Sequence, residues 1–332
     1  MIRCSIVLIT FNQLSKTKKC LDSLFNQNVL GSNDEVIIID NNSTDETKEY
    51  ISKLKDSRIH IYYNSKNEGF SKAVNQGIFH SKGKYVCLLN NDTVVRNGFV
   101  NNLIKGLESD ESSGAIGAYS SGMYEPMYLK EESKLDGKVK EIPVIFGFCM
   151  LFNRELVNEI GGFDEIYEIG NFEDLDFSER IKKIGKKLFI DGNTFIEHYH
   201  HASWTPEQLD LSLKRNYLRF VRKWKYDEQY LKNFTSEKIR YEKMTYIYVI
   251  KKSCENSEIE TYFNEWLNSD SLADIIVVDN TNFNKKLENV ILQIRKTRRI
   301  THIRTCNREE MTTQKLYRIG INNSFSDNNI LK

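Results

Sequence analysis

Apolar runs alternate with amphipathic segments along the first part of the chain. The runs Ser5–Thr10, Glu35–Asp40 and Tyr85–Leu89 are almost wholly apolar, as strands buried on both faces of a sheet are. Residues 15–27 and 70–81 carry apolar side chains at helical spacing. This alternation predicts an α/β fold, with a mostly parallel, doubly wound central sheet and helices on both faces.

Further elements are predicted from the same periodicities and from turn residues. A helix is expected over 45–55 and a strand over 58–64. Gly122, Pro126 and Gly137 interrupt the pattern in residues 119–142, which indicates a mobile loop or lid. Beyond this loop the pattern predicts, in order, strand 145–152, helix 155–160, helix 172–184 and strand 187–190.

The tail of the chain repeats the pattern of its beginning. The segment Ala273–Asn280 echoes Asp34–Asn41, and a strand-like run precedes each of them at nearly the same distance. The tail has Arg308-Glu309-Glu310 where the first copy has Asn67–Gly69, and it stops about where its own copy of Asn90–Asp92 would stand. We therefore predict three regions, which are a catalytic domain over 1–205, a helical segment over 206–243 and a partial, degenerate second α/β domain over 244–332.

Composition narrows the class of protein. The 332 residues include 47 Lys and Arg against 46 Asp and Glu, so the chain lacks the basic charge expected of a nucleic-acid binder. The six cysteines lie far apart, and we expect them to be reduced packing residues. No apolar run is long enough for a signal peptide or a membrane span, so we expect a cytoplasmic protein without a transmembrane segment, which could be peripheral to a membrane.

Polar side chains follow the predicted strands at the points where these end, at Thr10, Asp40, Asn67–Gly69 and Asn90–Asp92. A doubly wound sheet binds its ligands at the carboxyl ends of its strands. The chain has neither a GxGxxG fingerprint nor a Walker A loop, so a phosphate group would be met most simply through a metal ion. Asp92 offers a carboxylate for Mn²⁺ or Mg²⁺. Asn90 or Asn91 could add a weaker amide oxygen, although a plain polar turn is the alternative.

Two further groups of side chains suit chemistry on a phosphate-linked donor. Glu173, Asp174 and Asp176 begin a predicted helix, with Glu173 and Asp176 on one face, and one of the three could take a proton from an attacking hydroxyl. Compensation of the helix dipole is the alternative. His198, His200 and His201 could bind a metal or a phosphate, or could be structural.

Taken in order, these motifs resemble the family 2 glycosyltransferases of the GT-A fold over about residues 3–205. The matching segments are Ser5–Asn12, Ile39–Asp45, Asn67–Phe70, Leu89–Thr93, Gly161–Asp164, and Glu173-Asp174 through Arg180. The resemblance implies an enzyme that transfers a sugar from a nucleotide-linked donor with inversion at the anomeric carbon.

The resemblance also implies roles for single residues. Those expected to bind the nucleotide are Thr10, Asn12, Asp40, Asn67, Gly69, Asn90 and Asn91. Asp92, with Asn90 and His198, is expected to hold the metal, and Asp174 is the implied catalytic base, with Glu173 beside it. Asn90 departs from the family pattern, in which an Asp opens the metal motif, so weaker metal binding is expected.

The donor and the acceptor are less narrowly defined. We favour a UDP-sugar, with UDP-N-acetylglucosamine first, and a hydroxyl of a glycan or of a protein such as flagellin as acceptor. A non-catalytic nucleotide-sugar or glycan-binding module is an alternative, above all for the tail. A nucleotidyltransferase ranks third, because residues 10–13 form no Gly-rich basic loop.

Overall fold

The structure is a computed structural model that describes residues 1–25, 29–122, 125–199, 205–224, 245–268, 274–295, 299–307, 311–324 and 329–332. It divides into two compact units. The first comprises Met1–Leu156, Glu168–Gly170 and Asp174–Asp210, and the second comprises Val157–Tyr167, Asn171–Glu173 and Leu211–Lys332. The chain therefore passes between the two units several times around residues 157–174.

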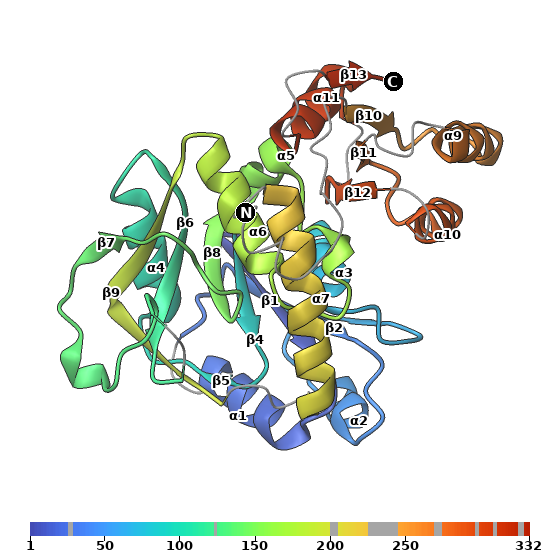
Figure 1. The fold of residues 1–332 in the computed structure, drawn as a ribbon. Coiled ribbons are helices and arrows are strands. Elements are labelled where there is room, and N and C mark those ends of the chain that lie inside the picture. Colours follow the sequence, from blue (N-terminus) through green and yellow to red (C-terminus); the bar gives the residue numbers. More distant parts are fainter. Residues whose placement is uncertain are drawn as a thin grey trace. The chain divides into compact units, whose positions relative to one another are not determined.

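The first unit is built on a nine-stranded sheet. Its strands lie in the order β3 (Ile59–Tyr63), β2 (Asp34–Asp40), β1 (Cys4–Thr10), β4 (Tyr85–Asn90), β8 (Cys149–Asn153), β6 (Ser113–Ser120), β9 (Lys187–His198) and β5 (Thr93–Val94), and β7 (Val139–Glu141) also pairs with β9 (Figure 1). Strands β3, β2, β1 and β4 are parallel, whereas β8 runs antiparallel to both of its neighbours. The predicted α/β class with a mostly parallel central sheet is confirmed.

Helices connect the strands of this unit and lie close to the predicted positions. They are α1 (Leu14–Phe25), α2 (Thr47–Ser52), α3 (Phe70–His80), α4 (Phe99–Glu108) and α6 (Glu173–Lys183), with the short turns η1 (Glu132–Lys134) and η2 (Arg154–Leu156). The prediction of a loop throughout 119–142 was wrong in part, because β7 pairs with β9 in the sheet. A three-residue strand is too short to show an alternating pattern in the sequence.

Register along the parallel strands determines where the polar side chains lie. Thr10 is paired with Asp40, and Ile9 is paired with Asn90, so the last residues of β1, β2 and β4 are level with one another. The interiors of these strands are buried apolar side chains, as both-face burial in a parallel sheet requires. The sheet thus brings Thr10, Asp40 and Asn90 to one edge.

The second unit has a separate four-stranded sheet in the order β12 (Arg299–Arg304), β11 (Asp274–Asp279), β10 (Thr245–Ile250) and β13 (Asn329–Leu331). Residues of α9 (Asn256–Asn268) and α10 (Lys285–Ile294) form one apolar cluster with the sheet, and residues of α11 (Thr313–Asn322) form another. The same unit contains α5 (Val157–Ile160), η3 (Glu165–Tyr167) and most of α7 (Pro206–Trp224). Of the predicted helical segment 206–243, the part after residue 224 lies outside the described residues.

The two sheets share their strand order and register. All pairs in the second sheet are parallel, and its order β12-β11-β10-β13 matches β3-β2-β1-β4 of the first. Ile250 is paired with Asp279 at the strand ends, as Thr10 is with Asp40. The described tail therefore has the topology that a second copy of the first half requires, while its membership in the same family stays a prediction.

Two glycines at corresponding places allow a helix to lie directly on each sheet. A Cβ on Gly77 of α3 would lie 2.2 Å from Cγ1 of Val7, and one on Gly320 of α11 would lie 2.2 Å from Cγ2 of Ile247. We expect Gly77→Ala and Gly320→Ala each to lower the free energy of unfolding by about 1–3 kcal/mol through overpacking. Denaturant unfolding of the full chain measures this, with exposed Asp22→Ala as the control. An unchanged midpoint for both glycine variants would contradict the close packing.

Candidate active site

The turn after β4 carries the predicted metal-binding carboxylate. Asp92 is only 6% exposed, and its carbonyl accepts a hydrogen bond of 3.0 Å from the backbone N–H of Tyr199. Thr93, the next residue, is paired with His198 in the β5–β9 ladder. The end of β9 therefore lies against this turn and brings His198 to Asp92.

His198 and Asp92 form a close pair. Nε2 of His198 lies 3.2 Å from Oδ1 of Asp92. Burial opposes ionisation of Asp92, but the hydrogen bond from His198 and the nearby charges of His198 and Lys16 together lower the pKa of the carboxyl. The imidazole ring stacks on Phe148, with ring centroids 4.9 Å apart. Asp92 is therefore ionised at neutral pH, beside an imidazole whose orientation is fixed.

Helix α1 supports the turn from the other side. The side-chain amide of Asn91 donates to the hydroxyl of Thr17 at 2.9 Å, and the thiol of Cys20 contacts the carbonyl of Asn90 at 3.6 Å. Burial raises the pKa of Cys20 to about 12, although a hydrogen bond with Thr93 works against this shift. Cys20 thus stays a neutral packing group and is not a thiolate ligand.

The residues predicted to contact the base form a closed network at the ends of β1 and β2. Thr10 and Asp40 are fully buried, and the Thr10 hydroxyl donates to Asp40 at 3.0 Å. The hydroxyl and backbone N–H of Ser43 also donate to Asp40, at 2.6 and 3.1 Å. Asn12 has a φ of 56° and accepts from the N–H of Thr44 at 2.7 Å. These side chains hold the β1 and β2 loops together at the sheet edge.

A second network shapes the loop before α3. The side-chain amide of Asn41 donates to Oδ1 of Asn67 at 2.8 Å, and the same oxygen accepts from the N–H of Gly69 at 2.9 Å. Gly69 has a φ of 83°, and a Cβ there would lie 2.1 Å from the carbonyl oxygen of Glu168. Only glycine fits at this position. Asn67 itself is exposed, so its side chain is accessible to a ligand.

Asp174 lies at the first turn of α6 with its carboxylate on a neighbouring loop. Oδ2 accepts from the N–H of Gly147 at 3.0 Å, and Oδ1 accepts from the N–H of Leu175 at 2.8 Å. Burial raises the pKa of Asp174 above its ordinary value, even though these hydrogen bonds favour the ionised form. A raised pKa makes this carboxylate a stronger base than an exposed aspartate.

The loop that binds Asp174 also borders the turn Asn90–Asp92, which we call the metal turn after its predicted role. Phe148 follows Gly147, and its carbonyl accepts from the N–H of Asn90 at 3.0 Å while its ring stacks on His198. Gly147 also lies next to the ring of Phe70, because its Cβ position is 3.6 Å from Phe70 Cε1. Two adjacent residues, Gly147 and Phe148, thus link the carboxylate of Asp174 to the turn of Asp92.

The other acids of α6 face elsewhere. Asp176 is fully buried and pairs with Arg180 at 2.9 Å, and Glu173 is 6% exposed. Asp174 is the more accessible of the three side chains. The structure therefore agrees with the helical spacing, which placed Glu173 and Asp176 on one face of the helix and Asp174 on another. His200 and His201 lie outside the described residues.

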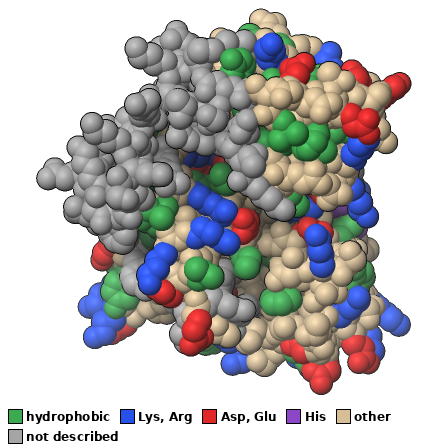
Figure 2. Space-filling view, turned by 45° about the vertical axis from the view of Figure 1, so that its right-hand side comes forward, with side chains coloured by type: hydrophobic (Ala, Val, Ile, Leu, Met, Phe, Trp, Pro, Cys, Tyr) green, Lys and Arg blue, Asp and Glu red, His purple; other side chains and the backbone are tan. Residues whose placement is uncertain are grey.

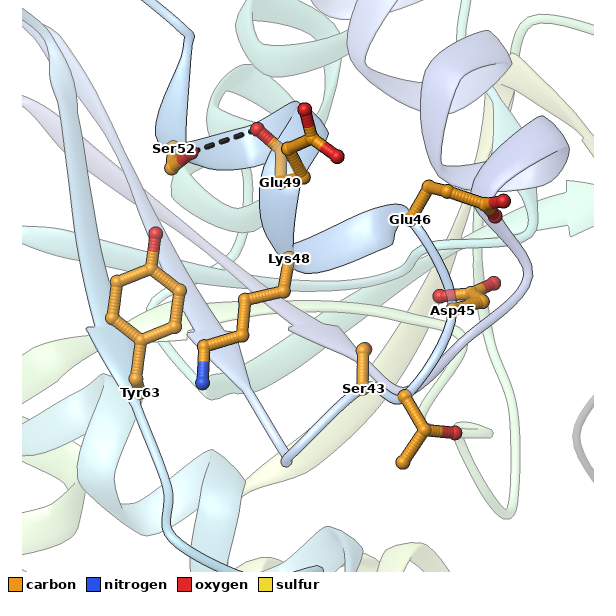
Figure 3. A pocket seen from close by; sticks show the side chains of 8 residues that line it. Ser43, Asp45, Glu46, Lys48, Glu49, Ser52 and Tyr63 are labelled. Atoms are coloured by element: carbon orange, nitrogen blue, oxygen red, sulfur yellow. Dashed lines mark hydrogen bonds between the residues drawn. The ribbon is translucent and has the colours of Figure 1, made fainter.

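An open hollow of about 660 Å³ lies beyond the turn that follows β2 (Figure 3). Its lining runs from Ser43 to Ser52 and includes Tyr63, whose ring lies 5.4 Å from the Nζ of Lys48. None of the predicted site residues lines the hollow, but it borders their network at Ser43, the partner of Asp40, and at Thr44 and Asp45, whose backbone N–H groups donate to Asn12. Asp92 and Asp174, the predicted metal ligand and base, do not line this hollow.

The side chains at the turn fit a divalent cation that is shared with a ligand. No cluster of three or more His, Cys, Asp or Glu side chains that could hold a metal occurs among the described residues. Asp92 and His198 offer one carboxylate and one imidazole, and partly exposed Asn90 offers an amide oxygen. So small a set suits an ion such as Mg²⁺ or Mn²⁺ that completes its shell with phosphate oxygens and water.

Sequence reasoning missed the residues that join the two halves of the site. Residues 145–152 were predicted as one strand, but β8 begins only at Cys149, and Gly147 and Phe148 precede it as a loop. The glycine within an otherwise apolar run was the available signal, because such a glycine marks a close approach of another chain segment. The contact partner, Asp174, could not be read from it.

Comparison with known proteins identifies relatives for the first part of the chain. Residues 5–161 match the family described as Glycosyl transferase family 2. Glycosyltransferase GlyG of Streptococcus pneumoniae is 23% identical over 234 residues, which cover 64% of this chain and 76% of GlyG. Glycosyltransferase GlyA of the same organism is 23% identical over 201 residues, covering 58% of this chain but only 28% of GlyA.

Solved structures show the same fold. GalNAc-T7, crystallised with UDP, GalNAc and Mn²⁺, superposes with a TM-score of 0.55 at 20% identity, over 69% of this chain and 49% of that protein.

In this chain, no helix among the described residues is both long and apolar enough to cross a membrane. On the face shown in Figure 2, acidic and basic side chains are interspersed, in keeping with the nearly zero net charge.

Proposed function

Because residues 5–161 belong to glycosyltransferase family 2 and the first unit has the GT-A fold, we propose that the chain is an inverting, metal-dependent enzyme that transfers a sugar from a UDP-sugar to a hydroxyl group. UDP-N-acetylglucosamine is the first candidate donor, and a glycan or a protein such as flagellin is the candidate acceptor. The observation that carries the proposal is the link from Asp174 through Gly147 and Phe148 to His198 and Asp92.

In this proposal Asp174 accepts the proton of the acceptor hydroxyl. The oxygen then forms a bond to the anomeric carbon while the bond from that carbon to the diphosphate breaks, and the bonding electrons leave with the nucleoside diphosphate. Attack opposite the leaving group inverts the configuration. The raised pKa of Asp174 suits this role, since a more basic carboxylate takes up the proton more readily.

Asp92, His198 and Asn90 are the residues that would hold the metal ion in this proposal. Mn²⁺ or Mg²⁺ bound there would neutralise the charge that develops on the departing diphosphate. The lowered pKa of Asp92 keeps its carboxylate ionised below neutral pH. The proposed nucleotide-binding side of the site consists of Thr10, Asn12, Asp40, Asn67 and Gly69. The cytoplasmic location stays a prediction.

Lys16 is a further group that we expect to act on the diphosphate. It precedes Cys20 by one helical turn, so both lie on the face of α1 that contacts the metal turn, and its charge contributes to the lowered pKa of Asp92. Asn90 is neutral where the family pattern has an Asp, so it does not offset the positive charge of Lys16. We expect Lys16→Met to weaken UDP binding about fivefold, or ~1 kcal/mol. Calorimetric titration measures the change, and unchanged binding would exclude this role.

Lys18→Met is the matched control for this experiment. Lys18 lies on the same helix, is exposed, and has its Nζ 5.1 Å from the ring of Tyr50 instead of near the metal turn. We expect its replacement to leave UDP binding unchanged. Equal losses in both variants would show a general effect of charge on α1.

Thermal unfolding with a panel of nucleotide sugars tests the proposed donor. A ligand that binds the folded state raises its stability by RT ln(1 + [L]/Kd), so the true donor should give the largest rise, and Mn²⁺ should increase it. UDP-N-acetylglucosamine, UDP-glucose, UDP-galactose and dTDP-rhamnose form the panel. Release of UDP from the selected donor separates an enzyme from a binding module, which would be stabilised without turnover.

A further inference from the structure

The segment that leads into Asp174 has a strained backbone. Glu168, Asn171 and Phe172 have φ values of 50°, 75° and 74°, in the left-handed region that side chains other than glycine rarely adopt. Such conformations are unfavourable for these side chains and persist only where the surroundings enforce them. The described contacts of residues 161–172 show what enforces them here.

Helix α7 binds the backbone of this segment directly. The side-chain amide of Asn216 donates to the carbonyls of Tyr167 and Asn171, at 2.8 and 3.2 Å. Arg219 donates to the carbonyl of Ile166 at 2.5 Å. Asn216 is fully buried, so the carbonyls that it binds have no ready replacement from solvent.

Helix α7 also holds the start of the segment through an ion pair. The Nζ of Lys223 lies 2.8 Å from Oδ2 of Asp164, whose side chain is fully buried. The partner of the predicted Gly161–Asp164 motif is therefore a residue beyond the predicted catalytic domain. Asp164 serves here as an anchor for the loop.

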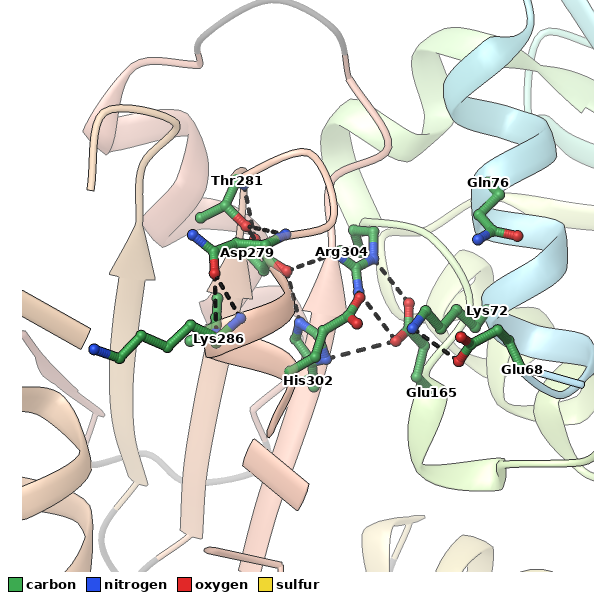
Figure 4. Close-up of polar contacts among 12 residues, drawn as sticks. Glu68, Lys72, Gln76, Glu165, Asp279, Thr281, Lys286, His302 and Arg304 are labelled. Atoms are coloured by element: carbon green, nitrogen blue, oxygen red, sulfur yellow. Dashed lines mark hydrogen bonds and ion pairs between the residues drawn. The ribbon is translucent and has the colours of Figure 1, made fainter. Parts of the chain in front are cut away.

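Strand β12 of the second sheet provides a second anchor (Figure 4). Arg304 is 2% exposed and binds both carboxylate oxygens of Glu165, from Nε at 2.8 Å and from Nη2 at 3.1 Å. The same guanidinium binds Asp279 at 2.8 Å and Glu288 at 2.9 Å. Paired carboxylate and guanidinium groups of this kind fix orientation as well as position.

The register of the repeat explains why this anchor exists. Arg304 is paired with Asp279, as Tyr63 is with Asp40 in the first sheet. Asp40 and Asp279 each accept from a hydroxyl group that follows the strand, of Ser43 and of Thr281, but Asp279 is also held by Arg304 and by Nε2 of His302, both at 2.8 Å. The edge of the second sheet that corresponds to the proposed nucleotide-binding edge of the first thus carries a cluster of internal ion pairs, and this cluster also binds Glu165.

We propose that Glu165 and Asn216 are positioning residues that hold the strained segment and thereby set where Asp174 meets the acceptor hydroxyl. The inference rests on the proposed role of Asp174. It assigns the second unit a task in catalysis that needs no ligand of its own. The segment reaches Asp174 within two residues of Phe172, so relaxation of its backbone moves the carboxylate from the position fixed at Gly147.

Glu165→Ala and Glu288→Ala test the inference as a matched pair. Both remove one carboxylate from the same guanidinium, and the two side chains are similarly buried, at 9% and 14% exposure. Arg304 keeps Asp279 as a partner in either variant. Only Glu165 lies on the segment that carries Asp174. In the full chain, with the donor selected by the panel and Mn²⁺, we expect Glu165→Ala to release UDP at least tenfold more slowly than Glu288→Ala.

Asn216→Ala and Thr305→Val form a second pair. Each removes a buried hydrogen-bond donor of the second unit, and Thr305 donates to Asn280 away from the strained segment. Only Asn216→Ala should slow the release of UDP, again about tenfold. The dissociation constants of donor and Mn²⁺ should stay unchanged in all four variants, which a merely structural role would not predict.

Equal rates for Glu165→Ala and Glu288→Ala, or a loss of rate matched by a loss of donor binding, would overturn the inference while leaving the proposed function intact. Full turnover in Asp174→Asn would instead overturn the proposed base, and the inference with it. A slow Glu165→Ala with normal donor binding and a melting temperature equal to that of Glu288→Ala supports the assignment.

Discussion

Asp174→Asn should lower kcat by about 10²–10⁴-fold, because an amide cannot take the proton of the acceptor hydroxyl. The substitution keeps the size of the side chain and an oxygen that can accept from Gly147, so the loop should remain in place. Donor and Mn²⁺ should bind as in the native enzyme. Steady-state release of UDP together with titration of the donor measures both quantities.

Glu173→Gln is the matched control for this prediction. Glu173 precedes Asp174 and is the other acid that the sequence proposes for catalysis, but its side chain is nearly buried. We expect Glu173→Gln to lower kcat by a smaller factor than Asp174→Asn does. The opposite order of losses would assign the base to Glu173.

The pH dependence of kcat follows from the same carboxylate. The proposed base can act only when ionised, and burial raises the pKa of Asp174. As the pH falls through this raised pKa the residue becomes protonated, so kcat should decline at a higher pH than an ordinary aspartate would produce. Any residual activity of Asp174→Asn should lack this decline.

Asp92→Ala should abolish the effect of Mn²⁺ on donor binding. Asp92 is the single carboxylate among the proposed metal ligands, and loss of a buried charged partner costs roughly 2–5 kcal/mol, which corresponds to a Kd for Mn²⁺ weakened about 30-fold or more. Binding of UDP without metal should change far less, since the nucleotide side of the site stays intact. Titration of UDP with and without Mn²⁺ gives both constants.

Two variants control this prediction. Glu46→Ala removes an exposed acid of the hollow and should leave the response to Mn²⁺ unaltered. Asn90→Asp adds a second carboxylate at a partly exposed strand end, and we expect it to bind Mn²⁺ more tightly than the native chain. A metal response that survives in Asp92→Ala would move the metal elsewhere.

The strand-and-helix plan was predictable because burial on both faces leaves a plain signal in a parallel sheet. The runs ending at Thr10 and Asp40 are each a strand, and register alone brings their last residues level. Strand β9 was predicted too short, because its pairing with β6 skips from Asp191 to Phe195. The residues skipped at this irregularity look like the end of a strand in the sequence.

The parts of the site that depend on contacts distant in sequence were not predictable. His198 and Asp92 were both predicted from motifs. Their close contact, and the stacking of the Phe148 ring on His198, depend on the pairing of β5 with β9. The ion pair between Arg304 and Glu165 joins residues that are 139 positions apart, so no local sequence pattern indicates it. Side-chain choice at such contacts is set by the tertiary partner and not by the neighbouring sequence.

The central claim is that Asp174 and Asp92 together perform an inverting transfer. Proton NMR of the sugar first released from the α-linked donor, with Mn²⁺ and with water as the acceptor, tests it most directly. We predict that the β anomer appears first, and that Asp174→Asn and Asp92→Ala both suppress its release. Initial appearance of the α anomer, or release that persists in Asp174→Asn, would contradict the claim.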